Sequence, residues 1–85
     1  MSFRDDIWKQ LKNMSADRLI SALLKDGFVL DATVRTERIY RHEEGRKVTI
    51  HYHVGSKTYG PKLLRALLQD IGWTEKDLRR LKLIK

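Results

Sequence analysis

One segment, residues 36–53, restricts the possible fold more than any other part of the chain. Its sequence, TERIYRHEEGRKVTIHYH, alternates polar and apolar residues on both sides of Glu43-Glu44-Gly45. Two alternating runs joined by a short glycine-containing loop predict a β-hairpin with strands at 36–42 and 47–53. Glutamate fits the positive-φ positions of a two-residue type I′ turn poorly, so a three-residue loop with left-handed Gly45 is favoured.

Helices and one more strand are expected around this hairpin. Ser15 and Thr74 are typical of helix N-caps, Pro61 of a first helical position, and Gly27 and Gly72 of helix ends. With the apolar periodicity, these signals predict helices at 3–13, 16–26, 61–71 and 74–81 and a strand at 28–34. The order α-α-β-β-β-α-α predicts an α+β two-layer sandwich, in which helices cover one face of a three-stranded antiparallel sheet. The other face is left to solvent or a ligand.

The same periodicities predict which side chains are buried. The expected core comprises Leu19, Ile20, Leu23 and Leu24 in the second helix and Leu63, Leu64, Leu67, Leu68 and Ile71 in the third. In the first strand, Phe28, Leu30, Ala32 and Val34 are expected to share one face. Tyr40 and Tyr52 share strand parity with Val48 and Ile50, so we expect them in the core as well.

Length and composition exclude several classes of protein. A chain of 85 residues is one domain, which we divide into an N-terminal extra helix (1–14), a core (15–73) and a C-terminal short helix (74–85). Cysteine is absent, so no disulfide or thiolate metal site is expected, which fits a cytoplasmic location. No apolar run approaches membrane-spanning length, and the N-terminus lacks the apolar stretch of a signal peptide.

The net charge of +7 favours a polyanionic partner such as RNA. Eight cations and three anions lie between residues 35 and 65, and tyrosines that could stack on bases are interleaved with them. An ordinary solvated basic surface, or a surface for an acidic protein, remains an alternative interpretation. The predicted RNA-binding residues are Arg35, Thr36, Arg38, Arg41, Arg46, Lys47, Lys57, Lys62 and Arg65.

All three histidines, His42, His51 and His53, lie in the same hairpin. With a three-residue loop, Glu37 faces His51 and Arg35 faces His53. With a two-residue loop, Glu37 faces Tyr52, and the carboxylate, the imidazoles and Arg35 no longer share one face. RNA cleavage without a metal needs a general base and a general acid, so Glu37, His51 and His53 are the catalytic candidates. An ordinary cross-strand contact is the alternative. No metal or other cofactor is predicted.

From Ser15 onward the chain resembles the HicA (YcfA-like) toxins of toxin–antitoxin systems. The matching segments are Lys25-Asp26-Gly27-Phe28, the glycine-turn strand pair, the Val48-Thr49-Ile50 strand and the helix at 63–72. This resemblance implies a double-stranded-RNA-binding-like fold, an endoribonuclease acting on mRNA, and a HicB-like antitoxin as partner.

The chain departs from the family pattern at one motif. Where the family has Gly-Ser-His, with a histidine tied to RNA cleavage, this chain has Arg35-Thr36-Glu37. Thr36 keeps the hydroxyl, but a carboxylate at Glu37 is an acceptor only. Three hypotheses follow: a ribonuclease toxin with a rearranged acid–base set, a non-catalytic RNA-binding module, and a small basic protein-interaction domain.

Overall fold

The structure is a computed structural model that describes residues 3–12, 14–51 and 59–85. Its strands form one antiparallel sheet in the order β1-β2-β3, so the predicted α+β architecture and element order are confirmed. In chain order the elements are α1 (Asp5–Leu11), α2 (Ala16–Lys25), β1 (Val29–Val34), β2 (Glu37–Arg41), β3 (Lys47–His51), α3 (Pro61–Ile71) and α4 (Glu75–Arg80). None of the helices in these described ranges is long and apolar enough to cross a membrane.

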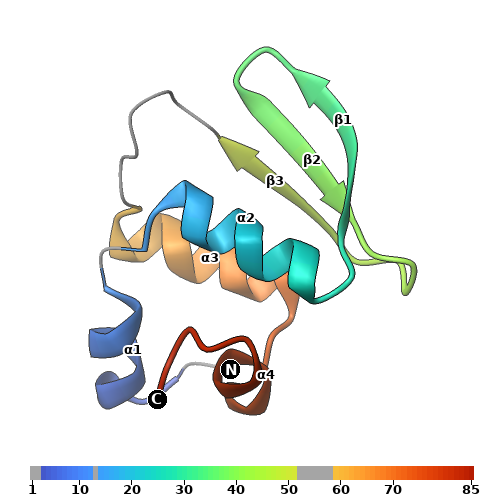
Figure 1. Ribbon diagram of the computed structural model, residues 1–85. Coiled ribbons are helices and arrows are strands. Elements are labelled where there is room, and N and C mark those ends of the chain that lie inside the picture. The colour runs from blue at the N-terminus through green and yellow to red at the C-terminus, as the bar shows by residue number, and fades with distance from the viewer. Residues whose placement is uncertain (1–2, 13, 52–58) are drawn as a thin grey trace.

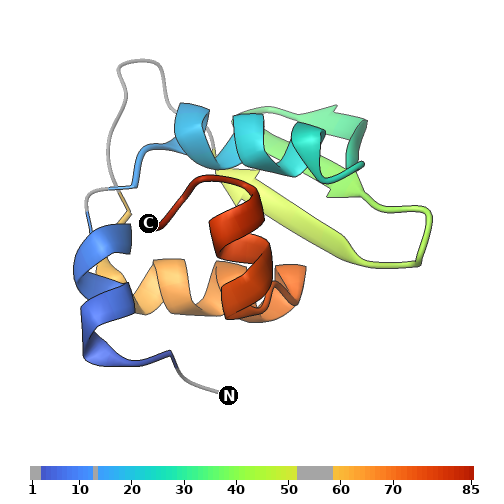
Figure 2. The same cartoon turned by 60° about the horizontal axis from the view of Figure 1, so that its bottom comes forward.

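The helices lie on one side of the sheet, and no element of the described residues covers the opposite face (Figure 1). Figure 1 shows α2 and α3 nearest the sheet, with α1 and α4 farther from it, and the rotated view in Figure 2 shows α4 in front of the other helices. A single core joins these elements. Its members include Tyr40, Val48 and Ile50 from the sheet, Leu19 and Leu23 from α2, Leu67 and Ile71 from α3, and Ile7, Leu11 and Leu78 from α1 and α4.

Local hydrogen bonds fix the ends of the helices as the sequence predicts. The Ser15 hydroxyl accepts a hydrogen bond from the Arg18 N–H at the start of α2. At the start of α4, the Thr74 hydroxyl accepts from the Asp77 N–H while the Asp77 carboxylate accepts from the Thr74 N–H, a reciprocal capping box. These bonds satisfy N–H groups that have no partner within the helix.

The hairpin between β2 and β3 has the predicted three-residue loop. Gly45 has a φ of 96°, its N–H donates to the His42 carbonyl at 2.9 Å, and the His42 N–H donates to the Arg46 carbonyl at 2.8 Å. Pairing then continues with Arg41 opposite Lys47 and ends with Glu37 opposite His51. The register that brings Glu37 and His51 together is therefore confirmed.

Two helix positions predicted to be buried are exposed. Leu24 and Leu63 are 54% and 42% exposed. In α2 the buried stripe runs through Leu19, Ala22 and Leu23. The helix thus turns Ala22 rather than Leu24 toward the core. In α3, Leu64 starts the buried stripe, and Leu63 lies about 100° away from it around the helix.

The prediction that Phe28, Leu30, Ala32 and Val34 share one face of the first strand is also wrong. The β1–β2 register shifts between Leu30 and Ala32, where Asp31 forms a bulge, and a bulge interrupts the alternation of faces. Leu30 pairs with the buried Tyr40, whereas Val34 pairs with Glu37. Both side chains are half exposed because β1 is an edge strand.

Candidate nucleic-acid interface

The uncovered face of the sheet carries alternate residues of β2 and β3. Tyr40, Val48 and Ile50 are buried on the helix side, so their neighbours along each strand point the other way. Cross-strand partners share a face, which groups the outward residues into rows. We call this surface the open face, and its β2 and β3 residues are Glu37 with His51, Ile39 with Thr49, and Arg41 with Lys47.

Glu37 and His51 form the first row of the open face. The Glu37 Oε1 lies 3.9 Å from the His51 Nδ1, and both side chains are about half exposed. This distance is too long for a hydrogen bond and short enough for an ion pair when the imidazole is protonated. The carboxylate and the imidazole are therefore adjacent, accessible to solvent, and able to turn toward a ligand.

The third row supplies positive charge on the same face. Arg41 and Lys47 are paired and both exposed, at the opposite end of β2 and β3 from Glu37. Four residues of strand separate Glu37 from Arg41, or about 13 Å. The Arg41 guanidinium also holds the Asp31 carboxylate at 3.3 Å. A chain of phosphates along β2 would thus meet cations at one end and the carboxylate–imidazole pair at the other.

Arg35 and Thr36 lie in the turn that leads into Glu37, and both are exposed. Arg35 has a φ of 57°, a conformation that glycine adopts readily and that costs other residues free energy. This is the position at which the resemblance places the family's glycine. The turn thus keeps the backbone shape expected of a glycine while adding a cation beside the open face.

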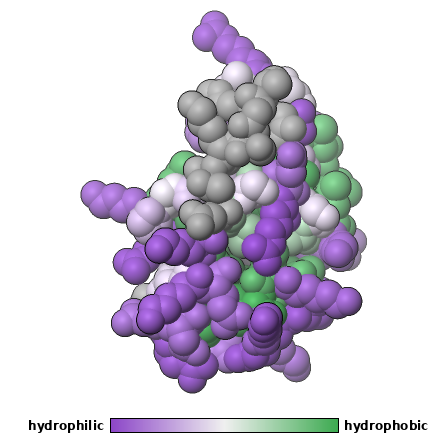
Figure 3. Space-filling view, turned by 60° about the vertical axis from the view of Figure 1, so that its left-hand side comes forward, coloured by the Kyte–Doolittle hydropathy of each residue, from purple (hydrophilic) through white to green (hydrophobic). Residues whose placement is uncertain are grey.

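The other predicted RNA-binding cations lie elsewhere. Arg38 is partly buried and pairs with Ile50 on the helix side of the sheet. Lys62 and Arg65 are exposed on α3, and the Arg65 guanidinium lies over the Trp8 ring of α1, 4.8 Å from its centroid. Figure 3, which views the side of α1 and the start of α3, shows a mostly hydrophilic surface. His53 and Lys57 lie outside the described residues.

Arg46 is held at the end of the molecule that carries the hairpin loop. Its guanidinium donates to the Ile71 carbonyl at 3.0 Å and to the Glu44 carboxylate at 2.7 Å, and it lies over the Phe28 ring at 5.2 Å. These contacts tie the hairpin to the end of α3. The structure therefore places Arg41 and Lys47 on the same sheet face as Glu37 and His51, with Arg35 in the adjoining turn, whereas the contacts of Arg46 direct it toward the end of α3.

His42 lies at the same end, beside Arg46, and is buried. The Glu44 N–H donates to its Nδ1 at 3.1 Å, so the ring proton lies on Nε2 and is donated to the Asp26 carbonyl at 3.0 Å. The ring also contacts Phe28 edge-on, with centroids 5.0 Å apart. Both ring nitrogens are thus used in joining the hairpin to the end of α2.

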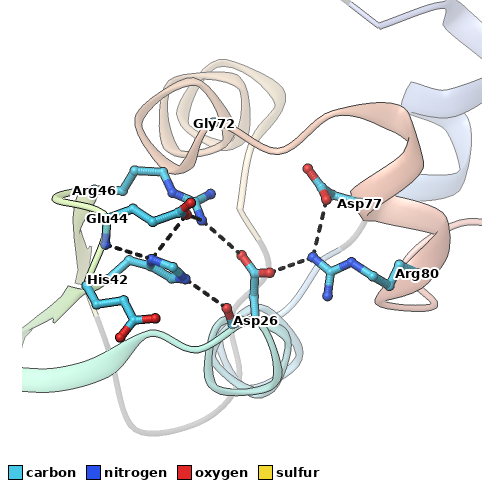
Figure 4. A pocket seen from close by; sticks show the side chains of 8 residues that line it. Asp26, His42, Glu44, Arg46, Gly72, Asp77 and Arg80 are labelled. Atoms are coloured by element: carbon cyan, nitrogen blue, oxygen red, sulfur yellow. Dashed lines mark hydrogen bonds and ion pairs between the residues drawn. The ribbon is translucent and has the colours of Figure 1, made fainter.

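Asp26 is the centre of a charged cluster that the sequence did not reveal (Figure 4). Its carboxylate is 9% exposed, accepts a hydrogen bond from Trp73 Nε1 at 2.7 Å, and pairs with Arg80 and, at 3.7 Å, with Arg46. Its hydrogen bond raises the pKa of Arg80. The partners are far away in sequence, so no local pattern could have indicated them. Asp26, Arg46 and Arg80 line a shallow pocket together with Glu43, Glu44 and Asp77.

Within the described ranges, no group of three or more histidine, cysteine, aspartate or glutamate side chains is placed to hold a metal ion. The side chains of Glu37 and His51 are of types that transfer protons and stabilise charge.

These features define a small α+β protein with an α-β-β-β-α core, two flanking helices and an open sheet face. A family model described as the HicA toxin of bacterial toxin–antitoxin systems matches residues 16–73. Because this match covers well over half of the chain, the protein belongs to the HicA toxin family. The comparison with curated proteins found no match. The helices α1 and α4 lie outside the matched residues, and membership of the family implies an antitoxin partner.

Proposed function

We propose that this protein is an mRNA interferase that binds RNA on the open face and cleaves it with Glu37 and His51. The observation that carries the proposal is the confirmed register, which sets a carboxylate against an imidazole on an accessible surface. Family membership supports a toxin of a toxin–antitoxin pair. Acting on mRNA, it works in the cytoplasm and is held inactive by a HicB-like antitoxin.

The two side chains divide the proton transfers of RNA cleavage. The Glu37 carboxylate accepts the proton of the 2′-hydroxyl, whose oxygen attacks the adjacent phosphorus. The protonated His51 imidazole donates a proton to the leaving 5′-oxygen, and the products are a 2′,3′-cyclic phosphate and a 5′-hydroxyl. A phosphate lying above the pair has both groups within reach. His53, the third catalytic candidate, follows His51 by two residues in the sequence.

The cations of the open face hold the RNA backbone. Lys47 and Arg41 contact phosphates on one side of the scissile bond, and Arg35 with the Thr36 hydroxyl contacts the other. Ile39 and Thr49 form a flat middle row on which a base can lie. Binding by these cations releases counterions, so affinity falls steeply as salt is added.

Incubation of the purified protein with end-labelled RNA in EDTA tests the cleavage. We expect Glu37→Ala and His51→Ala to lower the rate by about 100-fold, while Glu43→Ala, which removes an exposed carboxylate of the hairpin loop, leaves it unchanged. Products made equally by all four proteins would contradict the assignment of the pair.

A mobility-shift titration tests the binding surface separately. We expect Lys47→Ala to weaken RNA binding by about tenfold and to reduce its salt dependence. Lys62, also a predicted RNA contact, lies on α3 at the other side of the sheet. A similar loss for Lys62→Ala would mean that RNA extends beyond the open face.

A non-catalytic RNA-binding module is the second candidate, and Glu37 is the observation that favours it. A carboxylate in the position of the family's histidine removes the imidazole that the resemblance links to cleavage. In that case every protein above leaves the RNA intact, while the salt-sensitive mobility shift persists. An acidic protein as the sole partner would give neither cleavage nor a shift.

A further inference from the structure

The edge strand β1 exposes an unusual share of apolar surface. In the described part of the chain, five large apolar side chains are exposed, and three of them, Val29, Leu30 and Val34, belong to this strand. Each is at least half exposed, and Leu24, in the last turn of α2 before β1, is 54% exposed. Figure 1 shows β1 on the side of the sheet away from β3.

The backbone of β1 is available for further pairing. β1 pairs with β2 on one side, and within the described residues no strand pairs with its other side. An unpaired edge presents N–H and C=O groups that accept another strand. Val29 and Val34 lie on the open face and Leu30 on the helix side, as their partners Arg41, Glu37 and Tyr40 establish. An added strand would therefore meet apolar contacts on both faces of the sheet.

Charge distinguishes between the occupants of this edge. Lys25, the last residue of α2, lies four residues before β1, and Arg35 directly follows the strand; both side chains are exposed. The one charged residue within β1, Asp31, is paired with Arg41. Antiparallel pairing of two copies would place the Arg35 end of one beside the Lys25 end of the other, so that like charges meet at both ends of the joint, between two molecules that each carry +7. A strand with carboxylates at its ends would meet opposite charges there.

We propose that the edge of β1 is a docking site for one strand of a partner protein, an extended segment with apolar residues at its centre and carboxylates toward its ends. Main-chain hydrogen bonds to β1 supply affinity, and the contacts with Val29, Leu30 and Val34 set the register. The proposal does not depend on RNA cleavage, because it uses neither Glu37 nor His51, and it shares only Arg35 with the proposed RNA contacts.

Two synthetic peptides test the proposal with the full-length protein. Both have four central valines, and one carries two glutamates at each end where the other carries two lysines. We expect the glutamate peptide to bind saturably with a Kd below about 1 mM and to shift the backbone amide resonances of β1. The lysine peptide should bind about tenfold more weakly or not at all.

Matched variants locate the site. Leu30→Lys and Val34→Lys should each weaken binding of the glutamate peptide by about tenfold. Leu63→Lys, at an exposed apolar position on α3, should bind the peptide as tightly as the unchanged protein does. Circular dichroism establishes that all three variants are folded.

Other results would overturn the proposal. These are no binding of the glutamate peptide, equal binding of both peptides, or a loss of peptide affinity in Leu63→Lys as large as that in Leu30→Lys and Val34→Lys. Sedimentation adds a further outcome, since an unchanged protein that dimerises and becomes monomeric on Val34→Lys would assign the edge to a second copy of this chain instead.

Discussion

Glu37 and His51 lie directly opposite each other on β2 and β3, with the carboxylate Oε1 3.9 Å from the imidazole Nδ1. Glu37 stands where the family resemblance places a histidine, so in this chain an imidazole reaches that end of the open face from the neighbouring strand. In the proposed mechanism, the acid–base chemistry therefore depends on this residue pair rather than on one motif.

Replacing Glu37 by histidine tests this exchange directly. We expect Glu37→His to cleave labelled RNA about tenfold faster than the unchanged protein near pH 7, because imidazole transfers protons most effectively near its own pKa. Glu43→His, which adds an imidazole at the exposed hairpin loop, is the control and should have no effect. A rate that does not rise in Glu37→His would show that the family's chemistry needs more than this one side chain.

Arg35→Gly should stabilise the protein. The φ of 57° at Arg35 is unfavourable for a residue with a Cβ, and relief of this strain exceeds the entropy that glycine adds to the unfolded chain. We expect the free energy of unfolding to rise by about 0.5–1 kcal/mol, measured by urea denaturation. Thr36→Gly, at a position without positive φ, should lower it instead. If both variants were destabilised, strain at Arg35 would not explain the result.

Removal of the Asp26 carboxylate should destabilise the protein strongly. Asp26→Ala leaves Trp73 Nε1 without its acceptor and separates Arg80 and Arg46 from their shared partner. We expect the free energy of unfolding to fall by about 2–3 kcal/mol. Asp31→Ala removes a surface ion pair whose two side chains are about half exposed and should cost less than about 1 kcal/mol. Equal effects of the two substitutions would contradict the role given to Asp26.

The capping box of α4 should make the stability of the protein depend on pH in the acidic range. The Thr74 N–H hydrogen bond is the main cause that lowers the pKa of Asp77 below its ordinary value of 3.8. Its contribution is therefore present above that value and is lost as the pH falls through the lower pKa of the folded state.

We thus expect Asp77→Asn to be less stable than the unchanged protein at pH 7, and the difference in free energy of unfolding to shrink below about pH 4. Chemical denaturation at a series of pH values measures this difference. Glu43→Gln, at an exposed loop position, should show no comparable change, and a difference for Asp77→Asn that stayed constant with pH would rule out the cap as its origin.

Local chemistry made much of this fold predictable from sequence. The helix caps at Ser15 and Thr74, the left-handed Gly45 and the register of Glu37 with His51 all depend on groups within a few residues of a turn or a helix end. Such interactions are similar in the isolated segment and in the folded chain, which is why patterns of residue types reveal them.

The environment of each side chain was decided by tertiary structure. Leu24 and Leu63 carry helical periodicity yet remain exposed, because the direction from which a helix is covered depends on elements distant in sequence. Arg46 and Lys47 are adjacent cations, but Arg46 is fixed between Asp26 and Ile71 while Lys47 extends from the open face. The sequence alone thus determined the elements, their order and the hairpin register, since these follow from short-range forces. Tertiary structure decided which cations are exposed on the open face and which hold the elements together. This is because contacts between residues distant in sequence form only when the helices pack on the sheet.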